Sequence, residues 1–209
     1  GVAPLPPPPA AAAAARKAFY LNVYNALAVH SQIALGEPRG LPARLQIYAT
    51  ASYRVGPHIL SMNDIENGIL RGNRPGATPL ARAQFREGDP RRALALAELD
   101  PRVHFALNCG AVSCPPIQFY SEENLEEELE VSSRNYMKQV KVDSSSTAVQ
   151  LPKLLEYYSK DFGNNKNEVL QWVARYVSED QAEQIRAWID QGENIKISYG
   201  GYNWDSNKK

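Results

Sequence analysis

Residues 16–35 read RKAFYLNVYNALAVHSQIAL and carry the pattern of a long helix with one apolar face. The side chains at helical spacing on that face are Phe19, Val23, Leu27 and His30. Tyr24 and two asparagines flank this stripe. A helix that only packs in the core would carry fewer polar side chains there. The glycine and the proline that follow predict the end of the helix.

Short strand patterns follow this helix along the chain. Residues 45–60, LQIYATASYRVGPHIL, predict one or two strands interrupted by Gly56 and Pro57. Residues 102–107, RVHFAL, are the strongest strand pattern, and the prolines after them forbid a longer ladder. Residues 140–151 predict a hairpin with a serine-rich loop, and IKISY near the C-terminus predicts a last strand.

The remaining patterns are mainly helical. Ser61 with Asp64 reads as a capping signal for a short helix that ends at Arg71, and Ser178 with Gln181 as a capping box for a late helix. Further helical patterns cover residues 91–99, 121–138, 152–158, 169–176 and 180–190. Helices outnumber strands without alternating with them. The sequence therefore predicts an α+β fold, a helix-rich single domain around a small, mostly antiparallel sheet.

Length and charge narrow the classes of function. The 209 residues suffice for one domain, which we expect over residues 16–209 after a Pro/Ala-rich tail or linker at residues 1–15. Lysine and arginine number 23, as do aspartate and glutamate. This balance argues against nucleic-acid binding and against a polybasic membrane anchor. No apolar run is long enough to span a membrane, so the partner is expected to be a protein or a small molecule.

The cysteine content bears on the cellular compartment. Two cysteines, Cys109 and Cys114, are too few for a disulfide-rich secreted scaffold. The first residues lack the basic and apolar regions of a signal peptide. We therefore expect a cytoplasmic protein, with a secreted chain that has lost its leader as the alternative.

The segment that contains both cysteines, HFALNCGAVSCPPI, is the first candidate for chemistry. A cysteine at the end of a strand, as expected for Cys109, could act as a nucleophile if its pKa fell below the free value. A buried cysteine that packs as a small hydrophobe is the alternative. The spacing of Cys109 and Cys114 also permits a local, regulatory disulfide, although it does not match a CxxC redox motif.

Candidate partners of the cysteine come from the few histidines and from nearby polar residues. His58 or His104 could be the base, whereas His30 lies on the apolar stripe and is expected to be structural. The residues that could orient the imidazole are Asp64, Glu66 and Asn108. As alternatives, Asp64 caps its helix and Glu66 is a solvated side chain. No tight metal-ligand pattern such as HExxH occurs, so neither a metal nor another cofactor is expected.

Further polar residues could bind substrate or support the loops. Asn22, Asn25 and the amide of Gly110 are candidates for holding an oxyanion. In a protein without catalysis, the same asparagines would tie loops to the core. Arg71 and Cys114 complete the set of polar residues with a binding or structural role.

Three blocks of sequence together resemble the domain of unknown function 547 family. They are RKAFYLNVYNAL at residues 16–27, HILSMNDIE with GILRGNRP at residues 58–75, and DPRVHFALNCGAVSCP at residues 100–115. The resemblance extends over residues 16–152, with a looser echo in LPKLLEYYSKDFG and in the aromatic tail. It implies no established reaction, and relatives joined to leucine-zipper or glutaredoxin-like segments suggest regulation or redox coupling only by association.

This chain departs from the family pattern at three positions. The family commonly has tryptophan at Tyr20, histidine at Asn67 and aspartate at Asn203. The last two departures weaken a catalytic role for those positions. Two functions remain: a thiol-dependent hydrolase or acyl transferase that uses a Cys–His pair, and a non-catalytic interaction or redox-regulated module with structural cysteines.

Overall fold

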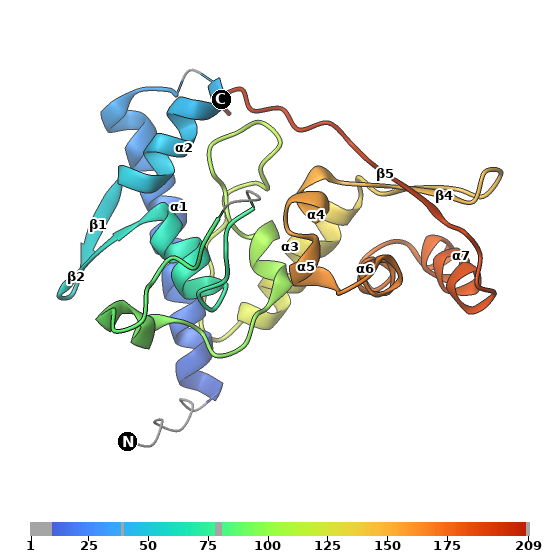
Figure 1. Cartoon of the computed structure of the whole chain (residues 1–209), viewed down its shortest axis with the longest axis horizontal. Coiled ribbons are helices and arrows are strands. Elements are labelled where there is room, and N and C mark those ends of the chain that lie inside the picture. Colours follow the sequence, from blue (N-terminus) through green and yellow to red (C-terminus); the bar gives the residue numbers. More distant parts are fainter. Residues whose placement is uncertain (1–9, 39, 78–80, 208–209) are drawn as a thin grey trace.

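The structure is a computed structural model that describes residues 10–38, 40–77 and 81–207. The first helix, α1, spans Ala10–Leu35 and lies against the η1 segment, Asp64–Leu70 (Figure 1). It begins at Ala10 rather than near Arg16, which agrees with the high helix propensity of alanine. The proline run of the expected tail, at residues 4–9, lies outside the described residues.

The other elements are short. The helices after α1 are α2 Gly40–Thr50, η1 Asp64–Leu70, η2 Pro90–Leu94, η3 Pro101–Phe105, α3 Leu125–Met137, α4 Lys153–Tyr157, α5 Ser159–Phe162, α6 Lys166–Val173 and α7 Glu179–Asp190. The strands are β1 Ser52–Val55, β2 His58–Ser61, β3 Lys141–Asp143, β4 Ala148–Leu151 and β5 Lys196–Tyr199. This composition confirms the predicted α+β class.

The strands form two small sheets. β1 and β2 make an antiparallel hairpin in which Val55 lies opposite His58, around the predicted break at Gly56 and Pro57. β4 pairs antiparallel with β3 and parallel with β5. The pairing is thus mostly antiparallel, as predicted, but it is divided between a two-stranded and a three-stranded sheet.

Two strand predictions are wrong. Residues 102–107 lie in and after the 3₁₀ helix η3, because the Asp100 side chain accepts a hydrogen bond from the Arg102 amide and Pro101 occupies the first turn. The residues before Ala51 belong to the helix α2 instead of a strand. A smaller correction concerns residues 91–99, where the 3₁₀ helix ends at Leu94.

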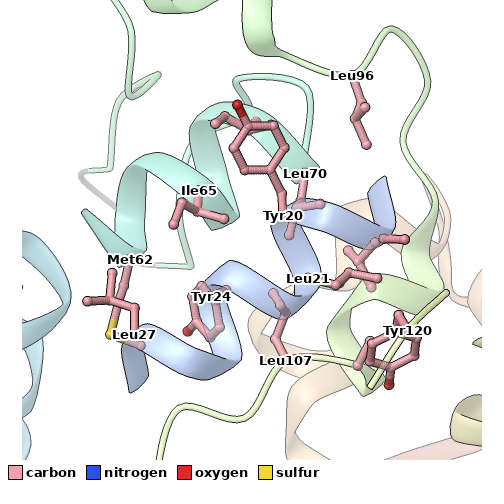
Figure 2. Packing of buried hydrophobic residues seen from close by; sticks show 14 of the residues in the cluster. Tyr20, Leu21, Tyr24, Leu27, Met62, Ile65, Leu70, Leu96, Leu107 and Tyr120 are labelled. Carbon is pink, nitrogen blue, oxygen red and sulfur yellow. The ribbon is translucent and has the colours of Figure 1, made fainter. Parts of the chain in front are cut away.

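The buried face of α1 also differs from the predicted stripe. Phe19 is 49% exposed, whereas Leu21, Tyr24 and Leu27 are buried. Figure 2 shows α1 between η1, with Ile65, and the segment that carries Leu107 and Tyr120. The buried face of α1 is more polar than a stripe of aliphatic residues. Tyr24 and Asn25 can lie there because both form hydrogen bonds inside the core.

The core consists of two hydrophobic clusters that meet at η3 and α3. The first cluster contains Val103 of η3 and Leu125 of α3, together with residues of α1 and η1. The second contains Phe105 of η3 and Met137 of α3, together with residues of α4, α6 and α7. The chain leaves η3 toward the two cysteines, so this junction positions their loop.

Candidate functional site

The two cysteines lie beside each other in the loop that follows η3. The Sγ atoms of Cys109 and Cys114 are 2.6 Å apart, and both residues are free thiols with partial exposure. The backbone amide of Cys109 also donates a hydrogen bond to Sγ of Cys114, at 3.2 Å. The intervening loop turns back at Gly110, whose φ of +84° favours glycine. The site is therefore a dithiol.

Asn108 holds this loop in its turn. Its Nδ2 donates to the carbonyl of Pro115 at 2.6 Å, and its Oδ1 accepts from the amide of Gly110 at 2.8 Å. The amide of Asn108 itself donates to Oδ1 of Asn25 on α1, at 2.9 Å. One buried asparagine thus closes the loop, and a second ties it to the core.

Two tyrosines from distant parts of the chain surround the sulfur atoms. The hydroxyl of Tyr202 lies 3.3 Å from Sγ of Cys114 and 3.7 Å from Sγ of Cys109. The hydroxyl of Tyr48, on α2, donates to the carbonyl of Cys109 at 3.2 Å. These contacts bring α2 and the C-terminal tail onto the dithiol.

The C-terminal tail, residues 200–207, runs along the cysteine loop. The amide of Val112 donates to the carbonyl of Asp205 at 2.9 Å, and the amide of Asn207 donates to the carbonyl of Gly110 at 2.9 Å. Arg44, which is only 1% exposed, donates to the carbonyls of Cys109 and Trp204 at 3.1 and 2.7 Å. The tail is therefore an integral wall of the site.

These surroundings give the two thiols different acidities. Side-chain hydrogen bonds, first from Cys114 and then from Tyr48 and Tyr202, lower the pKa of Cys109 to about 6 against the opposing effect of burial. Burial raises the pKa of Cys114 well above its ordinary value, and the neighbouring Cys109 raises it further. The two sulfur atoms titrate as a pair, and the pair loses its first proton at a lower pH than an isolated thiol would.

A small cavity of about 40 Å³ lies on the inner side of the dithiol. Its lining includes Glu66, Tyr24 and Tyr158 in addition to the two cysteines and His104. Glu66 accepts hydrogen bonds from Tyr24 at 3.0 Å and from Tyr158 at 2.5 Å. Burial, followed by the charge of Glu66, raises the pKa of both tyrosines well above the ordinary value, so both remain proton donors.

His104 also lines this cavity, but its ring is held by a carboxylate. Its Nε2 lies 2.8 Å from Oδ2 of Asp161, and its ring stacks on Tyr158 with centroids 4.0 Å apart. Asp161 accepts from Nε and Nη2 of Arg71 at 2.6 and 3.1 Å. Burial alone would raise the pKa of Asp161, but hydrogen bonds from His104 and Arg71 lower it to about 2.

The structure separates the other candidate residues from the dithiol. His58 opens β2 in the hairpin and is half-buried there. Asp64 caps its own helix, accepting from the amide and hydroxyl of Ser61, each at 2.9 Å. Asp64 also pairs with Arg91 at 3.2 Å. The carboxylate of Asp64 is therefore bound by Ser61 and Arg91.

The groups that were candidates for holding an oxyanion donate their hydrogen bonds to other groups of the protein. Nδ2 of Asn22 donates to the carbonyl of Tyr120 at 2.7 Å, and Nδ2 of Asn25 donates to the carbonyl of Ala106 at 2.9 Å. The amide of Gly110 donates to Asn108. These groups brace the loops around α1.

The described part of the chain contains no group of three or more histidine, cysteine or carboxylate residues placed to hold a metal ion. Within residues 10–38, 40–77 and 81–207, no helix combines the length and apolarity that crossing a bilayer requires.

The sequence matches the family model described as "Protein of unknown function, DUF547" over residues 10–137. The chain belongs to this family. The matched residues contain α1, η1, η3, the cysteine loop and α3, and therefore both thiols. No curated protein and no solved structure matches the sequence.

The sequence alone did not point to several residues around the dithiol. Tyr48, Arg44, Tyr158 and Asp161 contact the cysteine loop, its cavity or His104, and none was a candidate. The family echo in LPKLLEYYSKDFG did mark the segment of Tyr158 and Asp161, and the aromatic tail did mark Tyr202. Nothing in the sequence of α2 marked Tyr48.

Proposed function

We propose that this DUF547 protein is a thiol–disulfide exchange protein whose redox centre is the pair Cys109 and Cys114. The observation that carries the proposal is the 2.6 Å separation of the two Sγ atoms in a loop held by Asn108. Only a small approach of the sulfur atoms separates this arrangement from a disulfide bond of about 2.05 Å.

The acidity difference supports exchange chemistry. Thiol–disulfide exchange needs a thiolate, and the pKa of about 6 at Cys109 supplies one at neutral pH. Cys109 would be the stabilised thiolate of the reduced pair, and Cys114 the second sulfur that closes the disulfide. Tyr202 would stabilise the negative charge, and Asn108 would position the loop.

In the cytoplasm, which remains our expectation for the compartment, disulfides are transient and serve catalysis or sensing. A dithiol that opens and closes reversibly fits that compartment better than a permanent crosslink. The partner would be a protein or a small molecule with a thiol or disulfide.

The test is a redox titration of the purified protein in buffers of reduced and oxidised dithiothreitol, with thiols counted by alkylation and mass spectrometry. We expect Cys109 and Cys114 to lose their thiols together and reversibly within one chain. Cys109→Ser and Cys114→Ser should each abolish the intramolecular product. Thiols that stay reduced under oxidising buffers, or that form only dimers between chains, would refute the proposal.

A second candidate is the thiol-dependent hydrolase or acyl transferase, with Cys109 as nucleophile and His104 as base. It is favoured by the single cavity that both side chains line, with Glu66 beside them. Against it, the described residues provide no hydrogen bond between an imidazole and either sulfur, and Asn22, Asn25 and Gly110 are engaged elsewhere.

This candidate predicts turnover of an activated ester, such as a p-nitrophenyl acyl ester. The rate should fall by a factor of about a hundred or more when His104 becomes alanine. Stoichiometric acylation of Cys109 without turnover would exclude it and leave the exchange proposal intact.

A further inference from the structure

A surface cleft of about 450 Å³ opens directly onto Cys114. One wall is the loop of residues 112–116, and the other is the last turn of α3 and the turn that follows it, with Asn135, Tyr136 and Gln139. Cys114 lines both this outer cleft and the inner cavity, whereas Cys109 lines the inner cavity but not the cleft. A molecule that enters the cleft therefore reaches Cys114 before Cys109.

Building on the proposed exchange function, we infer that this cleft binds an extended, uncharged polypeptide segment that carries cysteine thiols. We further infer that Cys114 is the sulfur that exchanges with the segment, with Cys109 as the internal leaving group. The substrate class would then be protein dithiols rather than small anionic thiols.

The cleft offers groups that suit a peptide backbone. Asn135, in the last turn of α3, and Gln139, two residues beyond its end, are exposed amides that line one wall of the cleft. Each carboxamide can both donate to a backbone carbonyl and accept from a backbone amide.

The opposite wall adds apolar contact. Val112 is 50% exposed, and Pro115 and Pro116 line the cleft beside it. Proline has no backbone donor, so this wall favours side-chain contact over hydrogen bonding. The combination suits a polypeptide with one polar edge and small apolar side chains.

The charge of the cleft argues against glutathione. Among the residues that line it in the described structure, none carries a formal charge. Lys138, directly after α3, donates to Oδ1 of Asn135 at 2.9 Å. The two carboxylates of glutathione would therefore lack dedicated partners.

A substrate thiolate attacks Sγ of Cys114 in the oxidised protein, a bond forms between these sulfur atoms, and the Cys109–Cys114 bond breaks. Cys109 leaves as a thiolate, and the hydroxyl of Tyr202, 3.7 Å from its Sγ, can donate to it once Cys114 is bonded to the substrate. The second substrate thiol then loses its proton to solvent and displaces Cys114, so the substrate ends as a disulfide and the protein as a dithiol. A low-molecular-weight disulfide would reoxidise the protein.

The site of attack can be read directly. Oxidised protein is mixed with a neutral, acetylated hexapeptide amide that contains one cysteine, quenched in acid, alkylated and analysed by fragmentation between residues 109 and 114. We expect the peptide on Cys114 and the alkyl group on Cys109, and a rate at least about tenfold higher than with reduced glutathione at equal thiolate concentration. Attachment mainly to Cys109, or preference for glutathione, would overturn the inference.

Binding is measured separately, with a fluorescent peptide in which serine replaces cysteine. Gln139→Leu and Asn135→Leu should each weaken binding by roughly three- to tenfold, as expected for the loss of one hydrogen bond. Glu127→Gln, an exposed position in the first turn of α3, is the matched control and should bind like the wild type. Equal binding by all four proteins, or no binding, would overturn the cleft assignment.

The two arms separate the two proposals. If the dithiol does not cycle in the redox titration but the serine peptide binds and responds to Gln139→Leu, the exchange function fails and the cleft stands as a peptide site. If the dithiol cycles and the serine peptide does not bind, the exchange function stands and the cleft assignment fails.

Discussion

Hydrogen bonds to Sγ of Cys109 decide its reactivity, because burial alone would make this thiol less acidic. Removing one donor should therefore shift the titration of the sulfur upward. This effect can be measured at single residues, without reference to any substrate.

Tyr202→Phe removes one hydroxyl from the sulfur and leaves the ring in place. We expect the apparent pKa of Cys109, measured as alkylation rate against pH, to rise from about 6 toward its ordinary value. Tyr199→Phe, on β5, is the control and should leave the curve unchanged. An unchanged curve for Tyr202→Phe would show that this hydroxyl does not stabilise the thiolate.

Asp161 shows the same logic for stability. Its pKa is about 2 in the folded protein and about 3.9 in an unfolded chain, so its ionised form stabilises the fold above pH ~4. This contribution, about 2 kcal/mol, is lost as the pH falls through the folded pKa. At neutral pH, Asp161→Asn should cost about 3–5 kcal/mol, because it leaves Arg71 buried without its carboxylate.

Urea unfolding of the wild type and of Asp161→Asn between pH 2 and pH 7 checks this prediction. The difference in unfolding free energy should shrink as the pH approaches 2. Asp100, whose pKa is also about 2, is present in both proteins and cancels from the difference. A difference that stays constant over this range would refute the role of the Asp161 charge.

At the scale of elements, η1 packs so closely on Phe85 that a methyl group does not fit. A Cβ atom at Gly68 would lie 2.4 Å from the buried Phe85 ring. Gly68→Ala should therefore destabilise the protein by about 1–3 kcal/mol, despite the higher helix propensity of alanine. Gly201→Ala, with open space around the position, should change the unfolding free energy little. Equal midpoints of thermal unfolding for the two variants would show that η1 moves freely.

The elements also show which parts of the fold were predictable. Local signals succeeded where the deciding contacts are local: the capping box at Ser178, the Ser61–Asp64 cap and the turn at Gly56 were all visible in the sequence. Residues 102–107 failed because strand propensity lost to a local cap at Asp100 and to packing between two clusters. The proposed dithiol was visible as two nearby cysteines, whereas Tyr48 and Asp161 come from segments that only tertiary structure brings near.

At the scale of the whole molecule, Arg44 connects three distant segments. It joins α2 to the cysteine loop and to the C-terminal tail through two backbone carbonyls. Arg44→Leu should release the tail. We expect limited proteolysis within residues 200–207 to accelerate by about tenfold or more, because the local opening free energy falls by the energy of at least one charged hydrogen bond.

Arg54→Leu, in the hairpin strand β1, is the control for loss of an arginine and should leave the tail protected. The alkylation pKa of Cys109 should rise in Arg44→Leu but not in Arg54→Leu. If the tail is cleaved faster while Cys109 keeps its low pKa, Tyr202 would not depend on Arg44 for its position.

The placement of Tyr202 has a consequence for the newly made chain. Tyr202 is synthesised 93 residues after Cys109, so the thiolate cannot be fully stabilised while the ribosome is still extending that stretch. During this interval Cys109 lacks one of the hydroxyl groups that lower its pKa, so a smaller fraction of it is thiolate at neutral pH. Full stabilisation of the thiolate would thus wait until the tail has docked, and this would limit disulfide formation between the nascent polypeptide and other proteins.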